Sequence, residues 1–421
     1  MRFSGPFTLL GLVAVLSWPI YSLQGSILGQ RDLSQLSASQ ILSLASSSDP
    51  VKNIDTRNPN SHLSKILIPR AAGSENSTFV RNYIKSTLES LNWHVEEDSF
   101  TDNTPYGPRS FTNLIATKDP AASRRVIVSA HFDSKFFPHY PEDQFVGATD
   151  SAAPCAMMLD LAEALNPFLD QRSARLEEGL EDDEDIADTT LQLVFFDGEE
   201  AFKDWTDTDS VYGARHLAQH WSTSYIAPNS KRRLLGHASL TEISTIEHLI
   251  LLDLLGAARP SIRSYFSDTA WLFDAMASAE RRLAESGAFA YPEDSATTWP
   301  SFFIPRTGKE FTSGYIGDDH VPFLHKGVNI LHVIPYPFPR VWHTLKDDAS
   351  ALDIPTMRRW NLILRVLMSE YLNLRPNLPS KHERIQRADE DLVREQDSCP
   401  VFRTTDTCSN GLCLVADCKM S

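Results

Sequence analysis

Short runs of apolar residues recur along the 421-residue chain and have the length of β-strands. The clearest runs span residues 191–196, 249–255 and 330–334. Runs that are apolar on both faces are typical of central strands in a sheet that helices cover. Two further segments with strand-like patterns are residues 111–117 and 126–129. Together these segments predict one buried sheet.

Segments with helical spacing of apolar residues alternate with the strand-like runs. One of them follows Ser74 and Ser77, which are both candidate N-cap residues. Further helices are expected at residues 155–165, 271–286 and 360–374, and a short one within residues 24–49. Alternation of this kind predicts an α/β fold with a mainly parallel sheet.

The first 25 residues have the pattern of a secretory signal. Arg2 supplies a positive charge, residues 7–16 form a short apolar run, and small residues around Gly25 follow. We expect residues 1–25 to be removed on export, and an uncleaved signal-anchor is the alternative. No other stretch has the length of a membrane span. The expected location is therefore outside the cell or in the lumen of the secretory pathway, where the sequon at Asn76 can be glycosylated.

Cysteine usage agrees with export. Four of the five cysteines crowd the end of the chain: Cys399, Cys408, Cys413 and Cys418. In an exported chain they predict two disulfides of undetermined pairing, with a small structural zinc site as the alternative. Residues 376–421 are accordingly interpreted as a polar linker and a cysteine-rich tail.

The formal net charge of -16 argues against general nucleic-acid binding, which needs a basic surface. Acidic residues are concentrated between residues 172 and 188, and this stretch is expected to be a solvated surface loop. The length allows one large domain with appendages or two smaller domains. We expect a monomer.

Side chains that can bind metals follow the predicted strands, where the sites of open α/β sheets gather. They are His131, Asp133, Asp150, Glu199, Glu200, Asp253, Asp318, His320 and His343. Taken singly, such motifs are more often turns or local hydrogen bonds. Asp253 is harder to explain in that way, because a carboxylate flanked by four leucines is costly to bury unless it is paired or binds a metal.

Two carboxylates and a histidine meet the requirement of zinc for nitrogen or oxygen ligands with one position left open for catalysis. The adjacent acids Glu199 and Glu200 can then divide the work, because neighbouring side chains in an extended or turning backbone point apart. One faces the metal, and the other is a candidate general base and acid.

The motifs at these positions resemble those of the glutaminyl cyclases, which are relatives of the zinc aminopeptidases. The matching stretches are HFDSK (131–135), GATDSAAPCAMM (147–158), FFDGEEAF (195–202), LLDLLGA (251–257), DDHVPFL (318–324) and IPYPFPRVWHT (334–344). The last stretch distinguishes the cyclases from ordinary aminopeptidases. The resemblance covers residues 35–375 and implies a single three-layer α/β domain with a central mixed, mostly parallel sheet.

The resemblance also implies roles for matching residues. The ligands of one zinc ion per chain are Asp150, Glu200 and His343. Glu199 is the acid and base, and the acids that support the reaction through hydrogen bonds are Asp253 and Asp318. The aromatic wall of the substrate pocket is formed by Trp205, Phe338 and Trp342. The implied reaction converts an N-terminal glutaminyl residue of a peptide or protein, with glutamyl as a second candidate, to pyroglutamyl; from glutamine it releases ammonia.

Two positions depart from the family pattern. Ala130 stands where the family often has a cysteine bridged to the position of Cys155, so we expect Cys155 to be a free, buried thiol. Gly317 stands where the family often has a larger polar residue.

Two other functions are compatible with parts of the pattern. In a secreted zinc aminopeptidase, His131 and Asp253 complete a second metal site, and the metal pair generates a nucleophilic hydroxide. A binding ectodomain without catalytic activity is the other alternative, although such proteins usually lose the metal ligands that this chain retains.

Overall fold

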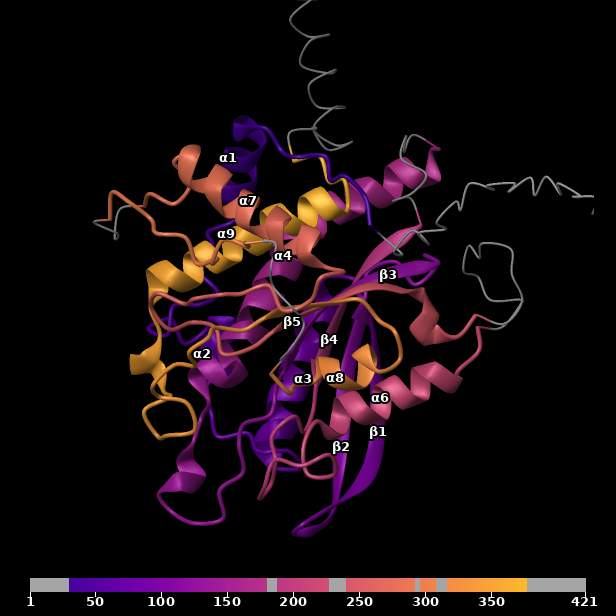
Figure 1. The fold of residues 1–421 in the computed structure, drawn as a ribbon, viewed down its shortest axis with the longest axis vertical. Coiled ribbons are helices and arrows are strands. Elements are labelled where there is room, and N and C mark those ends of the chain that lie inside the picture. The colour runs from indigo at the N-terminus through magenta and orange to yellow at the C-terminus, as the bar shows by residue number, and fades with distance from the viewer. Residues whose placement is uncertain (1–29, 180–187, 227–239, 292–295, 308–315, 377–421) are drawn as a thin grey trace, which may run out of the picture.

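The computed structural model describes residues 30–179, 188–226, 240–291, 296–307 and 316–376 (Figure 1). The expected secretory signal, the cysteine-rich tail and residues 180–187 of the acidic stretch lie outside these residues. No helix within them combines the length and the apolar character that crossing a membrane requires.

Six strands form one mixed sheet in the order β1-β2-β4-β3-β5-β6. The strands are β1 (His94–Thr104), β2 (Gly107–Thr117), β3 (Arg124–His131), β4 (Thr189–Phe196), β5 (Ile246–Leu252) and β6 (Ile330–Val333). The pairs β4–β3, β3–β5 and β5–β6 are parallel, whereas β1–β2 and β2–β4 are antiparallel. The prediction of an α/β fold with a mixed, mostly parallel sheet is confirmed.

The apolar runs in the sequence correspond to β2–β6, whereas the pattern did not predict β1. The side chains of β1 alternate between exposed and half-buried, and none is fully buried. A strand at the edge of a sheet needs no continuous apolar run, because only one of its sides is paired and its faces are partly solvated.

The helices are α1 (Ala38–Ser46), α2 (His62–Ile66), α3 (Glu75–Ser90), α4 (Ala153–Glu177), α6 (Tyr212–Thr223), α7 (Ala270–Glu285), α8 (His320–Leu324) and α9 (Ile354–Tyr371). Short helical turns are η1 (Glu142–Gln144), η2 (Ala148–Ala152), η3 (Glu242–Thr245) and η4 (Ala349–Ala351). Ser74 is the N-cap of α3, because its hydroxyl accepts a hydrogen bond from the amide of Ser77, which lies inside the helix.

The helices cover both faces of the sheet. The larger core packs the face that α3, α4, α7 and α9 cover, and a smaller core packs the face under α6 and α8 (Figure 1). Along β3, Val126 and Val128 face the larger core and Ile127 faces the smaller one, as the period of a strand requires. The sheet and its two helical layers therefore form the expected three-layer architecture.

One predicted loop is partly wrong. Helix α4 continues to Glu177, so the first part of the stretch between residues 172 and 188 is helical rather than a solvated loop. Arg172 and Arg175 are buried, and Nη1 of Arg172 donates a hydrogen bond of 3.0 Å to the carbonyl oxygen of Thr189. Long arginine stems can cover apolar surface while the guanidinium group finds polar partners, so charge alone misidentified this segment.

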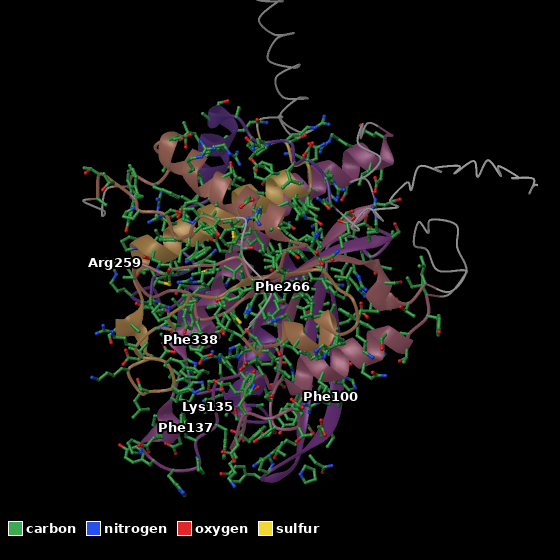
Figure 2. All side chains as sticks on the ribbon, in the orientation of Figure 1. Phe100, Lys135, Phe137, Arg259, Phe266 and Phe338 are labelled. Atoms are coloured by element: carbon green, nitrogen blue, oxygen red, sulfur yellow. The ribbon has the colours of Figure 1, made fainter. Side chains whose placement is uncertain are left out.

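The parallel strands end side by side. Strands β3, β4, β5 and β6 have their carboxyl ends at the same edge of the sheet, which is where ligands bind in open α/β folds. Lys135 and Phe338, from the segments that follow β3 and β6, are labelled in Figure 2 and line one cavity there.

Candidate metal centre and active site

Three predicted ligands converge at this edge of the sheet. Nε2 of His343 lies 3.3 Å from Oδ2 of Asp150 and 3.2 Å from Oε1 of Glu200. Both carboxylate oxygens are buried and accept no hydrogen bond. Four-coordinate zinc with bonds of about 2.0 Å separates its ligand atoms by about 3.3 Å, so both separations from His343 match the spacing of zinc ligands.

The charges of this group also favour a cation. Burial opposes the charge on His343, but its contacts with Asp150 and Glu200 outweigh burial and raise the pKa of the imidazole to about 9. Burial likewise opposes the charge on Asp150, but His131 and His343 lower the pKa of its carboxyl group. Asp150 is therefore an ionised carboxylate at a buried position, and such a charge needs a cationic partner.

A buried network fixes the segments that carry Asp150 and His343 to each other. Oδ1 of Asp347 accepts hydrogen bonds from the amide (2.8 Å) and the hydroxyl (2.9 Å) of Thr149, which precedes Asp150. Asp347 lies in the same loop as His343. Gly147 begins this turn with φ +52°, and a Cβ atom there would lie 2.0 Å from the carbonyl oxygen of Asp150. The network therefore fixes the two candidate ligands relative to each other.

Glu199 and Glu200 are held side by side in the turn after β4. Their backbone amides donate to Oδ1 and Oδ2 of Asp133, at 3.2 and 3.3 Å. Glu199 is buried, and burial together with the nearby charges of Glu200 and Asp318 raises the pKa of its carboxyl group well above the ordinary value. A carboxyl group with a raised pKa can both accept and return a proton near neutral pH.

Asp253 and Asp318 lie close to Glu199, but no hydrogen bond joins their carboxyl groups to each other. Asp253 accepts hydrogen bonds from the hydroxyl of Ser151 (2.5 Å) and the amide of Leu254 (2.8 Å). Asp318 is paired with Nε2 of His332 at 2.8 Å. Burial and the charge of Asp318 raise the pKa of Asp253 to about 6. The carboxyl groups thus interact through their charges, as expected for neighbouring acids.

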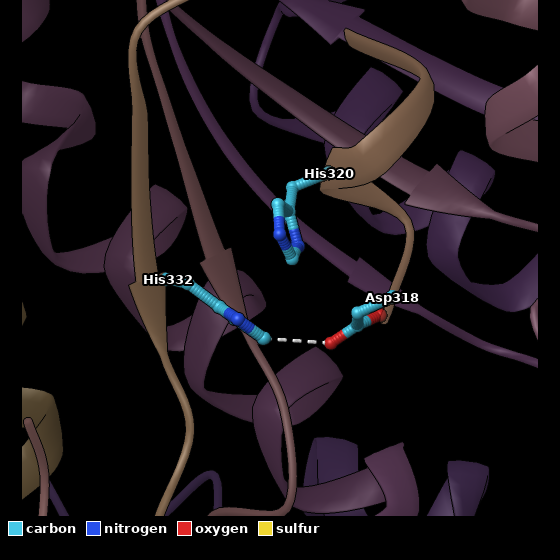
Figure 3. Close-up of side chains that lie close together, drawn as sticks. All are labelled: Asp318, His320 and His332. Atoms are coloured by element: carbon cyan, nitrogen blue, oxygen red, sulfur yellow. Dashed lines mark hydrogen bonds and ion pairs between the residues drawn. The ribbon is translucent and has the colours of Figure 1, made fainter. Parts of the chain in front are cut away.

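Two further groups of side chains have metal-capable atoms close together. One is His131 with Asp150 and Asp253, and the other is Asp318 with His320 and His332 (Figure 3). In each group an imidazole Nε2 is already hydrogen-bonded to a carboxylate oxygen, at 3.0 Å between His131 and Asp150 and at 2.8 Å in the second group.

The group of Asp150, Glu200 and His343 fits a metal better than these two groups do. Oδ2 of Asp150 and Oε1 of Glu200 are buried and accept no hydrogen bond, and both residues line the same cavity as His343. That combination leaves room for a substrate atom at the metal.

This cavity has a volume of about 430 Å³, and the predicted aromatic residues form its wall. Trp205 and Trp342 are 49% and 41% exposed, and the rings of Phe338 and Trp342 meet edge to face with centroids 4.9 Å apart. Trp342 also stacks on His343 at 4.0 Å.

Asp318 is the predicted site residue that does not line this cavity. It lines a neighbouring cavity of about 650 Å³, which also contacts Trp205 and Gly317. The remaining predicted residues line the 430 Å³ cavity: Asp150, Glu199, Glu200, Trp205, Asp253, Phe338, Trp342 and His343.

Several residues that organise the site were given no role by the sequence. They are Asp133, Lys135, Ser151, His332 and Asp347. Asp133 and Lys135 belong to the HFDSK stretch and Ser151 to the GATDSAAPCAMM stretch, so the motifs were the available signal for them. His332 and Asp347 lie outside the matching stretches, and only the fold brings them to their partners.

Two single-residue predictions concern the surroundings of the site. Cys155 is a free, buried thiol, as predicted, and its Sγ donates to the carbonyl oxygen of His131 at 3.2 Å. Asn76 is exposed in the first turn of α3, and its Nδ2 donates to the carbonyl oxygen of Pro69 at 2.7 Å.

The fold defines the class of protein. The family model for "Peptidase family M28" matches residues 113–368. A crystal structure of a glutaminyl cyclase from Macrostomum lignano is 35% identical, covers 82% of this chain and 97% of its own, and superposes with a TM-score of 0.67. A zinc-dependent exopeptidase from Parabacteroides distasonis has the same fold, with 18% identity, a TM-score of 0.50, and coverage of 80% of this chain and 99% of its own.

Curated relatives narrow the class. The glutaminyl-peptide cyclotransferase of Bothrops jararaca is 42% identical over 318 residues, which are 74% of this chain and 80% of that protein. The enzyme of the same name from Bos taurus is 40% identical over 314 residues, which are 74% of this chain and 81% of that protein. The chain therefore belongs to the glutaminyl-peptide cyclotransferases of the M28 fold.

Proposed function

We propose that this protein cyclises the N-terminal glutaminyl residue of peptides and proteins to pyroglutamyl and releases ammonia. The observation that carries the proposal is the cavity in which a candidate zinc site, a buried glutamate with a raised pKa and an aromatic wall meet. Membership of the cyclotransferases supports the same reaction.

Asp150, Glu200 and His343 would hold one zinc ion per chain. When bound there, zinc supplies Lewis-acid polarisation of the γ-carbonyl group of the substrate glutamine. The rest of the chemistry falls to the side chains around it and to the substrate itself, whose α-amine is the nucleophile.

Glu199 is the proton carrier in this proposal. Its carboxylate accepts a proton from the α-amine as that nitrogen attacks the carbonyl carbon of the side-chain amide. It returns the proton to the amide nitrogen, which departs as ammonia when its bond to that carbon breaks. The raised pKa of Glu199 suits this role, because it makes the carboxylate a stronger base toward the amine. Asp253 and Asp318 lie near Glu199 in this proposal. Asp253 is held by a hydrogen bond from Ser151, and Asp318 by its contact with His332.

Trp205, Phe338 and Trp342 complete the pocket. Their rings contact the glutamine side chain and displace water from it, and this water would otherwise hydrolyse the γ-amide. The pocket also holds the amine close to the carbon that it attacks, and this positioning itself lowers the barrier.

The test is incubation of the purified protein with a Gln-initiated peptide, followed by ammonia release and the mass of the product. We expect stoichiometric ammonia and a product lighter by one ammonia. A peptide shortened by its first residue would instead support an aminopeptidase. No change in the peptide would support the binding ectodomain.

Metal content separates the same alternatives, because the group of His131, Asp150 and Asp253 offers a second position. Elemental analysis of dialysed protein should give one zinc per chain. Two tightly held ions per chain would favour the two-metal peptidase.

We further infer that the enzyme is a monomer exported through the secretory pathway, with a glycan at Asn76 and disulfides among the four tail cysteines. The exposure of Asn76 in α3 supports this proposal. Treatment of secreted protein with a glycosidase should reduce its mass, and Asn76→Gln should abolish that change.

Thiol labelling after denaturation without reductant should modify only Cys155, whereas five labelled thiols would contradict the disulfides.

A further inference from the structure

Lys135 closes the HFDSK stretch, and its side chain reaches the candidate metal site. Its Nζ donates to Oε2 of Glu200 at 3.3 Å and to the carbonyl oxygen of Ala201 at 3.2 Å. The side chain of Lys135 is 16% exposed and that of Glu200 is 3% exposed. The ion pair is therefore largely shielded from solvent, and its charge interaction is stronger than that of a surface pair.

This contact gives the two oxygens of Glu200 different environments. Oε2 is bound by the ammonium group of Lys135, whereas Oε1 accepts no hydrogen bond and lies 3.2 Å from Nε2 of His343. The backbone of the same turn is fixed by Asp133, which accepts the amide of Glu200. Oε2 of this carboxylate is thus bound to Lys135, and Oε1 is directed to the candidate metal position.

We propose that Lys135 is a positioning residue that makes Glu200 a ligand through one oxygen only. The inference rests on the proposed zinc site of Asp150, Glu200 and His343. Partners that orient a metal ligand commonly change metal affinity 10- to 100-fold when they are removed. Ligation through a single oxygen also keeps the coordination number low, and a position remains open for the substrate carbonyl group.

A direct contact between Lys135 and the substrate is the competing explanation, because Lys135 lines the cavity. Two observations favour the positioning role. Both contacts of the ammonium group go to the wall of the cavity, to Glu200 and Ala201. In addition, the contact to Glu200 falls on the oxygen that does not face His343.

The test compares the full-length wild type with Lys135→Met and Lys135→Arg. Methionine keeps the apolar stem but removes the charge and the donors, whereas arginine keeps both. Zinc affinity is measured by competition with a chromophoric chelator, and the visible spectrum is recorded after replacement of zinc by cobalt(II). Kinetics with a Gln-initiated peptide give kcat and KM separately.

We expect Lys135→Met to bind zinc about 10- to 100-fold more weakly than the wild type. Its cobalt spectrum should lose intensity in the visible bands, because a glutamate that binds through both oxygens raises the coordination number. Lys135→Arg should give an affinity and a spectrum between those of the wild type and Lys135→Met.

Lys118→Met is the matched control. The side chain of Lys118 is also buried, at 6% exposure, and Nζ pairs with Asp170 at 2.7 Å, but this pair lies far from the metal ligands in the fold. The control should lower the stability of the protein and leave zinc affinity and the cobalt spectrum unchanged.

The outcomes separate this inference from the proposed function. If the wild type holds zinc and cyclises the peptide, but Lys135→Met keeps the same affinity and spectrum, the positioning role is wrong and the proposed function stands. A rise in KM alone would assign Lys135 to substrate contact and also overturn the role. A wild type that binds no zinc would remove the metal site and this inference together.

Discussion

Glu199 shows how a single position gains its chemistry from its neighbours. The side chain lies next to a candidate ligand, its amide is fixed by Asp133, and burial together with neighbouring acids raises the pKa of its carboxyl group. A glutamate in water would be a weak base at neutral pH, so the surroundings supply the proton affinity that the reaction needs.

Glu199→Gln should retain zinc and the fold while losing cyclisation by a factor of about 10² to 10⁴, the usual contribution of a positioned acid or base. The amide keeps the size of the side chain but cannot carry the proton. Steady-state kinetics and zinc content measure the two effects, with Glu89→Gln on the exposed face of α3 as the control. Activity within a few-fold of the wild type would remove Glu199 from the mechanism.

Asp197, which precedes the turn with both glutamates, is buried with one oxygen bonded to the amide of Thr112 and the other without a partner. Burial and the charge of Asp133 raise its pKa from 3.8 to about 8. Between these values the folded protein binds a proton that the unfolded chain does not, so this group makes folding less favourable as pH rises.

Asp197→Asn removes this titration. The stability of the variant relative to the wild type should therefore increase as pH rises from about 4 to about 8, and the difference should level off above that range. Urea unfolding at several pH values measures the effect. Stability curves that stay parallel across this range would show that Asp197 is ionised in the folded protein.

At the scale of elements, α4 and α9 are joined by a buried ion pair. The guanidinium of Arg365 donates to both oxygens of Asp160, at 3.0 and 2.8 Å, and both side chains are fully buried. Burial nevertheless raises the pKa of Asp160, despite the opposing charge of Arg365. The cost of burial thus exceeds the gain from the attraction to Arg365 for this carboxyl group. A buried pair of this kind adds little net stability, although breaking it is costly.

Arg365→Met should destabilise the protein by about 3–5 kcal/mol, because it leaves the carboxylate of Asp160 buried without its cation. The double variant with Asp160→Leu should be more stable than Arg365→Met alone. Denaturant unfolding of the single and double variants measures the coupling. Additive losses would indicate that the two side chains act independently.

The elements differ in how far the sequence predicts them. Strands β4, β5 and β6 are recognisable because both of their faces are buried, whereas β1 is not, because its side chains are exposed or half-buried. Helix α6 is not among the predicted helices, although its buried residues Ala214, Leu217, Ala218 and Trp221 have helical spacing.

The residue types and motifs were sufficient to predict the candidate ligands and the candidate acid and base. The ligand set and Glu199 follow from a resemblance, and the sheet then brings them together. The partners of Asp253 and Asp318 could not be predicted, because Ser151 and His332 approach them only after distant strands have paired. Hydrogen bonds of this kind depend on tertiary geometry and leave no local pattern.

For the molecule as a whole, the candidate metal site joins segments that follow different strands. Asp150 follows β3, Glu200 follows β4 and His343 follows β6. A metal at this point therefore links the carboxyl ends of the sheet. A ligand that binds only the folded state stabilises it, by about 4 kcal/mol when its free concentration is a thousandfold above Kd.

Removal of zinc with a chelator should lower the melting temperature, and addition of zinc should restore it. His343→Ala should lose this dependence, because the remaining carboxylates lack the third ligand. Scanning calorimetry with and without chelator measures both. If the wild type loses its zinc to the chelator but its melting temperature does not change, the metal does not contribute to stability.

Ala130 and Cys155 have a consequence for where the catalytic fold can exist. The sulfur of Cys155 is hydrogen-bonded to the carbonyl oxygen of His131, and Ala130 gives it no partner to bridge. Within the described residues, the joint between β3 and α4 therefore depends on packing and not on oxidation. The described part of the fold should therefore keep its structure in reducing surroundings, because this joint has no disulfide to open. Its stability is in this respect independent of the redox state of its surroundings.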